Sequence, residues 1–331
     1  QTQRLLLAKR LLTDSSLPVA DVAFASGFSS VRRLNALFQK RYRLNPTALR
    51  RATHVPQDSL RCELAYRPPL NWQALLSFLA SRAIAGVEKI SRDRYLRTVA
   101  IGNYQGWIQV SPVPNQDKLQ VELSTSLVAA ILPVLTRVKL LFDLNADPVL
   151  IAASLSDLPS FSPGLRVPGA FNGFEVAIRA ILGQQVSVKA ATTLMGRVVQ
   201  KFGTPIQTAI AELTHLTPTP IQIAQCSISD LAELGIVSTR AASMIAIAEA
   251  LVNGDLSLDS YAEVESAIAA LKSLPGIGDW TAQYIAMRVL AYPDAFPYSD
   301  LGLRRALKVE KPSQVLQLAE SWRPWRSYAA M

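Results

Sequence analysis

The sequence has few of the residues that build covalent or metal-bound frameworks. Only two of its 331 residues are cysteines, Cys62 and Cys226, and only two are histidines. Two cysteines cannot form a disulfide framework, a four-thiolate zinc site or a cysteine-ligated iron–sulfur cluster, so we expect no metal site of these kinds. No run of 18 apolar residues and no signal peptide is present. We therefore expect a reduced, cytoplasmic protein that does not bind a membrane, and, since the chain starts at Gln1, a processed chain or a fragment.

Acidic residues are scarce near the N-terminus. Residues 1–52 contain ten Lys and Arg but only Asp14 and Asp21, which gives this region a net charge of +8. The remaining 279 residues carry 24 basic and 23 acidic groups and are nearly neutral. Because phosphate neutralisation supplies most non-specific affinity for nucleic acids, this asymmetry predicts a DNA-binding arm on a neutral body.

The basic arm has the pattern of short helices. Residues Gln3–Leu12 are amphipathic, a Ser-Gly-Phe-Ser turn follows at 26–29, and Val31–Tyr42 continues at helical spacing. Arg32 and Arg33 fall on the outer face of this last helix, near its N-terminal end, where a recognition helix touches DNA. The alternative is a small helical cap with a solvated basic face.

The segment LPVADVAFASGFSSVRRLNALFQKRYRLNPTALRR resembles the second helix-turn-helix of AraC/Ada-type transcription regulators. The likeness covers nearly all of residues 2–51 and implies contact with promoter DNA through Arg32 and Arg33. The family uses two such motifs, and this sequence contains one. The methyl-accepting cysteine domain of Ada-type regulators is absent, so we expect no alkyl transfer to protein within this chain.

The pattern divides the rest of the chain into a linker and two domains. Residues 53–59 are expected to be the linker. Residues 60–147 predict a small α+β unit, in which we expect a scaffold, with strands at 60–66, 95–101, 106–110 and 118–123 and helices at 72–85 and 127–142. Residues 148–331 predict a helical domain, with helices at 174–182, 187–201, 221–224, 229–234, 238–253, 262–274, 279–291 and 301–307. The expected fold class is mainly α with an α+β subdomain of antiparallel strands.

A tight turn in LPGIGDWTAQYIAMRVLAYPDAFPYSD separates two of these helices. Glycines at 276 and 278 allow conformations closed to other residues and a close approach to a partner. Backbone N–H groups at the start of the following helix, which carries Thr281, form an anion site suited to a DNA phosphate. An ordinary helix–helix turn is the alternative. The acid Asp300, 22 residues after Gly278, makes the combination more specific.

From about residue 62 onward, the chain resembles the helix-hairpin-helix superfamily of DNA glycosylases, and within it the 3-methyladenine DNA glycosylase II (AlkA) type. The likeness lies in YRPPLNWQALLSFLASRAIAGVE, LRVPGAFNGFEVAIRAILGQQVSVKAA, the hairpin and WRPWRSYA. By motif position, the resemblance implies that Asp300 is the catalytic acid, that Trp280 and Tyr284 line the base pocket, and that Gln185 wedges into DNA. The bland alternatives are a plain helix cap for Asp300, core packing for the aromatics and an ordinary turn residue for Gln185.

The implied reaction fits these residue types. An alkylated purine is cationic and leaves readily, so one ionised carboxylate can stabilise the oxocarbenium-like sugar and orient water. Asp300 would stand at a helix N-terminus, which favours its charge. The base must leave the stack, and Trp280 or Tyr284 would hold it by cation–π attraction. Related bifunctional enzymes have a Schiff-base lysine where this chain has Trp280, so strand cleavage is not expected.

Three functional hypotheses follow. The first is a monofunctional glycosylase that removes 3-methyladenine or 7-methylguanine from duplex DNA, acting as a nucleoid-associated monomer without a required cofactor. The hairpin carbonyls are a candidate site for a structural monovalent cation. The second is a regulator of the alkylation response whose body is inactive, and the third is a non-enzymatic hairpin protein. The family has a further aromatic residue just beyond WRPWRSYA, and the sequence ends at Met331 before it, so either the chain is truncated or the pocket lacks one wall.

Overall fold

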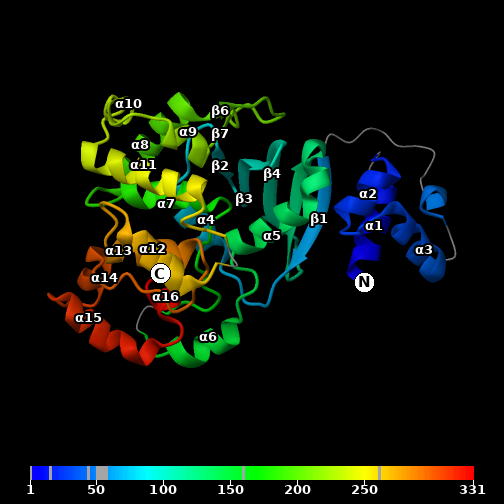
Figure 1. Ribbon diagram of the computed structural model, residues 1–331. Helices are drawn as coiled ribbons and strands as arrows, with labels where there is room; N and C mark the ends of the chain where they lie inside the picture. The colour runs from blue at the N-terminus through cyan, green and yellow to red at the C-terminus, as the bar shows by residue number, and fades with distance from the viewer. Residues whose placement is uncertain (1, 15–16, 43–44, 50–58, 159–160, 260–261) are drawn as a thin grey trace.

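The computed structural model describes residues 2–14, 17–42, 45–49, 59–158, 161–259 and 262–331. The expected linker therefore lies outside the described residues, apart from Ser59. Within the described ranges the chain forms an N-terminal helical region, a five-stranded sheet with its own helices, and a larger helical part (Figure 1). None of the described helices is long and apolar enough to cross a membrane.

The N-terminal region is a helix-turn-helix. It consists of α1 (Thr2–Asp14), α2 (Val19–Ala25), α3 (Val31–Tyr42) and the 3₁₀ turn η1 (Pro46–Leu49). The predicted helix at 31–42 is confirmed residue for residue, and two of its side chains, Leu34 and Phe38, are fully buried. The turn before it contains Gly27 at φ 77°, a conformation that favours glycine.

Five antiparallel strands form the sheet, in the order β1-β5-β4-β3-β2. Their bounds are β1 (Ser59–Ala65), β2 (Glu88–Ser91), β3 (Arg94–Ile101), β4 (Tyr104–Pro112) and β5 (Lys118–Ser124). Four of them correspond to the predicted strands. The edge strand β2 was not predicted, because its four residues, EKIS, are too few and too polar to show alternation.

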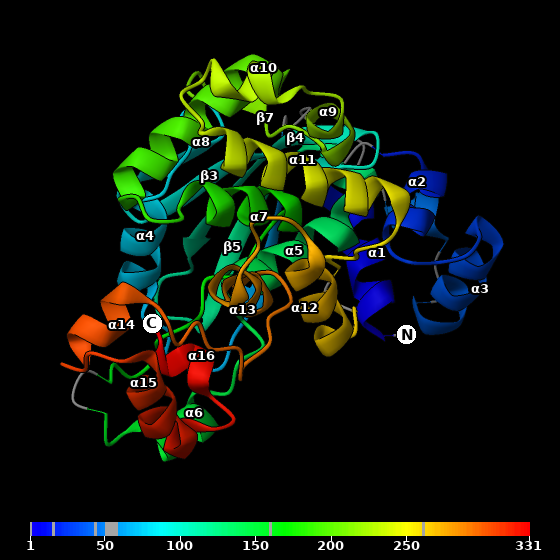
Figure 2. The same cartoon turned by 60° about the vertical axis from the view of Figure 1, so that its left-hand side comes forward.

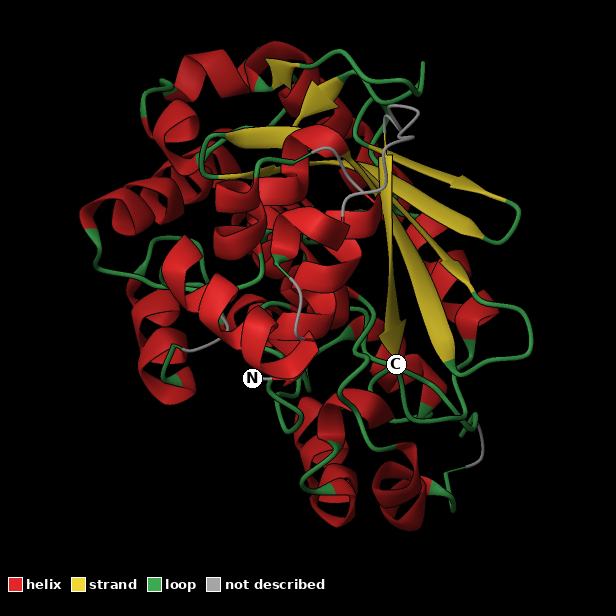
Figure 3. Ribbon diagram, turned by 90° about the vertical axis from the view of Figure 1, so that its right-hand side faces the viewer, coloured by secondary structure: helices red, strands yellow, loops and turns green. Residues whose placement is uncertain are grey.

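The helices of this unit differ from the prediction in length. Helix α4 (Trp72–Ala80) stops before the predicted end at 85 because the chain turns there toward β2, and the Glu88 carboxylate accepts the amide of Ile84 at 3.1 Å. A single helix was expected at 127–142, whereas the chain forms a 3₁₀ segment, η2 (Thr125–Ala130), followed by α5 (Ile131–Leu141). Figure 3 shows the strands fanning out on one side of the molecule, with helices beside, behind and below them.

The helix-turn-helix shares a hydrophobic core with the sheet unit. Residues of α1 to α3 belong to the same buried cluster as the sheet, α4 and α5. A methyl group placed on Gly27 would lie 3.3 Å from Leu132 of α5, so the turn itself sits against the sheet unit. The second core belongs to the helical part but includes Ile84 and Val87, which precede β2. The two parts of the body are therefore interlocked rather than merely adjacent.

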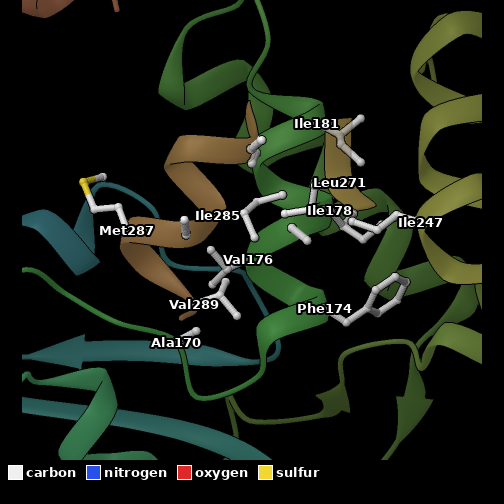
Figure 4. Close-up of a cluster of buried hydrophobic side chains, with 14 of the residues drawn as sticks. Ala170, Phe174, Val176, Ile178, Ile181, Ile247, Leu271, Ile285, Met287 and Val289 are labelled. Atoms are coloured by element: carbon white, nitrogen blue, oxygen red, sulfur yellow. The ribbon is translucent and has the colours of Figure 1, made fainter. Parts of the chain in front are cut away.

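The helical part is built around α7. Its helices are α6 (Pro148–Leu155), α7 (Gly173–Leu182), α8 (Val188–Phe202), α9 (Pro220–Ala224), α10 (Ile228–Ala232), α11 (Ser238–Asn253), α12 (Val264–Ser273), α13 (Asp279–Arg288), α14 (Leu301–Ala306), α15 (Pro312–Ala319) and α16 (Arg326–Ala329), with the two-residue strands β6 (Thr204–Pro205) and β7 (His215–Leu216) and the 3₁₀ turn η3 (Glu320–Trp322). Figure 2 shows α7 between α11 and α13. In Figure 4, Ile178 and Ile181 of α7 lie among Ile247, Leu271 and Ile285 of the surrounding helices.

Candidate functional site

A cavity of about 270 Å³ opens between the sheet unit and the helical part. The helical part contributes α7, the start of α8, α13 and the residue before α14. The sheet unit was expected to be a scaffold, but Arg82, Glu88 and Arg97 also line this cavity, so that expectation was incomplete. Asp300, Trp280 and Tyr284, which the sequence singled out, all lie in its wall.

Asp300 is the N-cap of α14. Its Oδ1 accepts the backbone N–H groups of Gly302 at 2.7 Å and Leu303 at 3.1 Å, and its Oδ2 accepts the indole Nε1–H of Trp280 at 2.9 Å. Three donors on two oxygens suit an ionised carboxylate, which can only accept hydrogen bonds. The cap and a role in the cavity are thus compatible, because capping fixes the carboxylate while it still lines the opening.

Trp280 and Tyr284 are four residues apart on α13 and stack on each other. Their ring centroids are 5.2 Å apart, with 14° between the planes. The tyrosine lies deeper, where its hydroxyl accepts a hydrogen bond from Arg288 Nη1 at 2.7 Å. The stack leaves no space between the two rings, so a planar ligand in this cavity would meet Trp280 on its other face.

Arginines crowd the inner end of the cavity. Arg288 is 5% exposed and also donates to the carbonyl oxygens of Pro168 and Gly169. Burial raises the pKa of Tyr284, but the charges of Arg288, Arg82 and Arg179 outweigh burial and hold that pKa below its usual value. The electrostatic environment at this end therefore favours negative charge or a hydrogen-bond acceptor.

Part of the cavity wall is a buried network of paired charges. Arg97 donates to Glu175 at 2.6 Å, and both side chains are 3% exposed. Arg179 donates to Glu88 at 3.1 Å, and the Tyr95 hydroxyl donates to the same carboxylate at 2.5 Å. Burial raises the pKa of Glu88, yet Arg179 and Arg97 more than offset it and hold the pKa below its usual value. Removing one member would leave a buried charge unpaired, so the network fixes the sheet unit against α7.

The sequence pattern did not predict this network. The partners Arg97 and Glu175 are 78 positions apart and come from different domains. The one available signal was the pair Glu175 and Arg179, which lie one turn apart in an otherwise apolar helix, GFEVAIRAIL. Charges inside such a helix need buried partners, and that requirement could have pointed to the cavity.

The hairpin consists of α12, the turn at 274–278 and α13. Gly276 has φ 73°, as expected for a position that needs glycine. The expectation was wrong for Gly278, whose φ of −85° is open to any residue. A methyl group there would meet no atom within 4 Å, so the glycine leaves open surface above the N-terminus of α13. Thr281 is only 2% exposed, and its hydroxyl faces the protein, where it accepts a hydrogen bond from Gln184.

Gln185 lies in the turn between α7 and α8, beside the cavity mouth. It is exposed and has φ 55°, while its neighbours Gly183, Val186 and Val188 line the cavity. The preceding residue, Gln184, was not singled out from the sequence. Its side-chain amide donates to the Gly276 carbonyl at 3.0 Å and to the Thr281 hydroxyl at 2.9 Å, which ties this turn to the hairpin.

Arg32 and Arg33 are exposed in the first turn of α3, as expected. The Arg33 amide donates to Ser30 Oγ at 3.2 Å, which caps this end of the helix. Helix α3 lies in a different region of the molecule from α7, α8 and α13, which contribute residues to the cavity wall (Figure 1). Within the described ranges, no group of three or more His, Cys, Asp or Glu side chains could hold a metal ion.

Comparison with known proteins divides the chain in three. Family models match it as a helix-turn-helix domain at residues 1–52, as an AlkA N-terminal domain at 61–172, and as an HhH-GPD superfamily base excision DNA repair protein at 178–314. The DNA-3-methyladenine glycosylase 2 of Escherichia coli is 36% identical over 268 residues, which cover 81% of this chain and 94% of the relative. The probable bifunctional transcriptional activator/DNA repair enzyme AlkA of Mycobacterium tuberculosis is 36% identical over 99% of this chain and 69% of its own length.

Solved structures agree on the fold. A 3-methyladenine DNA-glycosylase from Archaeoglobus fulgidus superposes with a TM-score of 0.69 at 21% identity, covering 81% of this chain and 95% of that one. A structure described as MBOgg1 in complex with a low-affinity DNA ligand superposes with a TM-score of 0.60 at 17% identity, covering 75% and 92%. The body of the chain thus has the fold shared by these glycosylases.

Proposed function

Since the chain belongs to the AlkA family of DNA-3-methyladenine glycosylases, we propose that it removes alkylated bases such as 3-methyladenine and 7-methylguanine from duplex DNA by hydrolysis of the N-glycosidic bond. This is the first step of base excision repair. The observation that carries the proposal is the position of the Asp300 carboxylate, which lines a cavity of base size and is held there by Trp280 and two backbone N–H groups.

The carboxylate supplies the chemistry that a cationic leaving group requires. An alkylated purine departs without protonation, so the barrier lies in the positive charge that develops on the sugar. Asp300 is fixed by three hydrogen bonds before any substrate binds, and a fixed anion pays no reorganisation cost when that charge appears. The same carboxylate can orient the attacking water, because its Oδ2 accepts only the Trp280 hydrogen bond and can accept another.

The base would be held on the exposed side of Trp280. Its other side is covered by Tyr284, and the Arg288 guanidinium lies 5.6 Å from the tyrosine ring centroid. A cationic base therefore gains cation–π attraction, on the order of 1–2 kcal/mol when desolvated, from the tryptophan rather than the tyrosine. The arginines behind the stack would repel a cation that went deeper, which keeps the base near Asp300.

Strand cleavage is not part of the proposed activity. Trp280 stands two residues after Gly278, where the related bifunctional enzymes carry their Schiff-base lysine. No lysine is found among the described residues that line the cavity. The DNA partner is proposed to be a duplex bound by a monomer, with a phosphate at the N-terminus of α13. A monovalent cation on the hairpin carbonyls stays a prediction.

Product analysis on methylated duplex DNA tests the proposal. The wild type should release free 3-methyladenine or 7-methylguanine and leave an abasic strand that breaks only after alkali treatment. Asp300→Asn should release at least a hundredfold less, whereas Asp255→Asn, the same change at an exposed position, should match the wild type. No base released by the wild type would refute the function, and a borohydride-trapped protein–DNA adduct would refute its hydrolytic character.

The exposed N-terminal end of α3 favours a second function, the binding of promoter DNA. Arg32 and Arg33 are free to reach a major groove there, and the helix-turn-helix is anchored on the sheet unit rather than tethered loosely. Selection of bound sequences from a random duplex pool tests it. A shared motif that weakens in Arg32→Ala would support sequence recognition, and recovery of unrelated sequences would contradict it.

A further inference from the structure

We propose that Gln184 is a positioning residue that locks the turn carrying Gln185 to the DNA-gripping hairpin, so that the wedge and the phosphate site meet one duplex in fixed register. The inference rests on the proposed function, since it concerns how that site opens a duplex. Gln184 itself need not touch the base or the reacting atoms.

The side-chain amide of Gln184 uses both of its donors on the hairpin. One goes to the carbonyl oxygen of Gly276 at 3.0 Å and the other to the hydroxyl of Thr281 at 2.9 Å. The Gly276 carbonyl can only accept, so the NH₂ group must face it and the orientation of the amide is fixed. The first acceptor belongs to the left-handed Gly276, and the second belongs to Thr281 in the first turn of α13. The backbone N–H groups proposed to bind a phosphate, at the N-terminus of α13, lie between them in the chain.

Helix α11 holds the same two segments from the other side. The backbone carbonyl of Gln184 accepts a hydrogen bond from Arg240 of α11. One turn further along this helix, Ser243 packs so closely under the hairpin that a methyl group on Gly276 would lie 2.1 Å from its hydroxyl oxygen. The Gln184 backbone, the Gln184 side chain and the hairpin thus form one closed assembly on α11.

Gln185 depends on this assembly for its position. Its φ of 55° is a left-handed conformation that a non-glycine residue keeps only when its surroundings impose it. Within the described part of the chain, its side chain makes no hydrogen bond and is exposed. The neighbouring residue Gln184 therefore supplies the restraint. Flipping requires the wedge and the phosphate grip to act together on one nucleotide, and a turn free to shift against the hairpin would lose that coupling.

The test replaces the two donors without changing size or charge. Gln184→Met has a side chain of similar length that cannot donate, and Gln225→Met is the matched control at an exposed helix end. Flipping is followed by the fluorescence of 2-aminopurine placed at the target position of a duplex. Single-turnover excision of an alkylated base is measured on duplex and on single-stranded DNA, because the single strand needs no wedge. Affinity is measured with a duplex that carries a tetrahydrofuran abasic analogue.

Gln184→Met should lower the flipping signal and duplex excision about tenfold or more, the usual consequence of losing a structural hydrogen bond. Excision from the single strand should stay within about twofold, and Gln225→Met should match the wild type throughout. Equal losses on both substrates, an unchanged flipping signal, or no fluorescence rise with the wild type would each overturn the proposal. A wild type that flips the base but releases none would refute the proposed function while leaving this positioning role testable by fluorescence.

Discussion

The helix-turn-helix and the hairpin present DNA with different kinds of surface. The first concentrates a net charge of +8 in 52 residues and exposes Arg32 and Arg33 at the start of a helix. The second belongs to a nearly neutral body and exposes backbone at Gly276 and Gly278. Net charge would locate only the first of these surfaces. The contrast suggests that long cationic side chains provide attraction over a distance, whereas the hairpin provides a fixed geometry next to the chemistry.

Of the residues near the hairpin, Trp280 is expected to have the largest effect on excision. Trp280→Ala removes the surface on which the base rests and also the donor that holds Asp300 Oδ2, so excision should fall about a hundredfold. Trp280→Phe keeps an aromatic face but lacks the N–H donor, so its excision rate should fall about tenfold. Single-turnover kinetics at saturating enzyme measure both variants. Wild-type activity in Trp280→Phe would show that the hydrogen bond to Asp300 has no role, and equal activity of the two variants would show that the aromatic face has none.

The two hairpin glycines should separate stability from DNA affinity. Gly276→Ala forces a left-handed alanine against Ser243 and should lower the free energy of unfolding by about 2–4 kcal/mol, measured by urea denaturation. Gly278→Ala has an allowed φ and open space, so its stability should change by less than about 0.5 kcal/mol. Its affinity for duplex DNA should still fall about tenfold, because the new methyl group occupies the approach to the helix N-terminus. Unchanged affinity would place the phosphate elsewhere.

A smaller effect, on DNA affinity and not on excision, is expected from the arginines of the helix-turn-helix. Arg32→Ala or Arg33→Ala should weaken duplex binding a few-fold and reduce the slope of log affinity against log salt by about 1. Excision at saturating enzyme should not change. Arg41→Ala, at the other end of α3, is the matched control. A salt slope that stays the same would show that neither arginine contacts a phosphate.

The body should also respond to pH through one buried acid, Asp143. Burial raises its pKa to about 6, against 3.8 for an ordinary aspartate, although the Tyr328 hydroxyl donates to it at 2.8 Å. The folded state then binds more protons than the unfolded state between these values, so the contribution to stability is present at low pH and lost as pH rises through 6. Between pH 5 and pH 7, the free energy of unfolding of the wild type should fall by about 1 kcal/mol relative to that of Asp143→Asn, measured by urea denaturation. Parallel pH profiles would contradict this assignment.

The sequence predicted the parts of the site that depend on local pattern. Helix α3 was placed residue for residue because its turn and its hydrophobic spacing are both local, and Asp300 was placed at a helix start for the same reason. Helix α6 was missed because it is apolar along almost its whole length and shows little helical periodicity.

What depends on partners distant in the chain could not be predicted. Gln184 contacts residues 92 and 97 positions away, and its amide looks like any other in the sequence until the hairpin folds against it. The same holds for the charge pairs that join the sheet unit to α7. The expected glycine-only conformation at 278 was wrong because the turn bends at Gly276 alone, which a pattern of two glycines cannot show.

The most direct measurement compares two variants, Asp300→Asn and the double variant Arg32→Ala/Arg33→Ala, in single-turnover release of 3-methyladenine from one duplex at saturating enzyme. The cavity, and not the basic arm, should carry the reaction. We predict a loss of at least a hundredfold for Asp300→Asn with its affinity for an abasic duplex kept within about threefold, and a rate within about twofold of the wild type for the double variant. Full activity of Asp300→Asn, or an equal loss in both variants, would contradict the account.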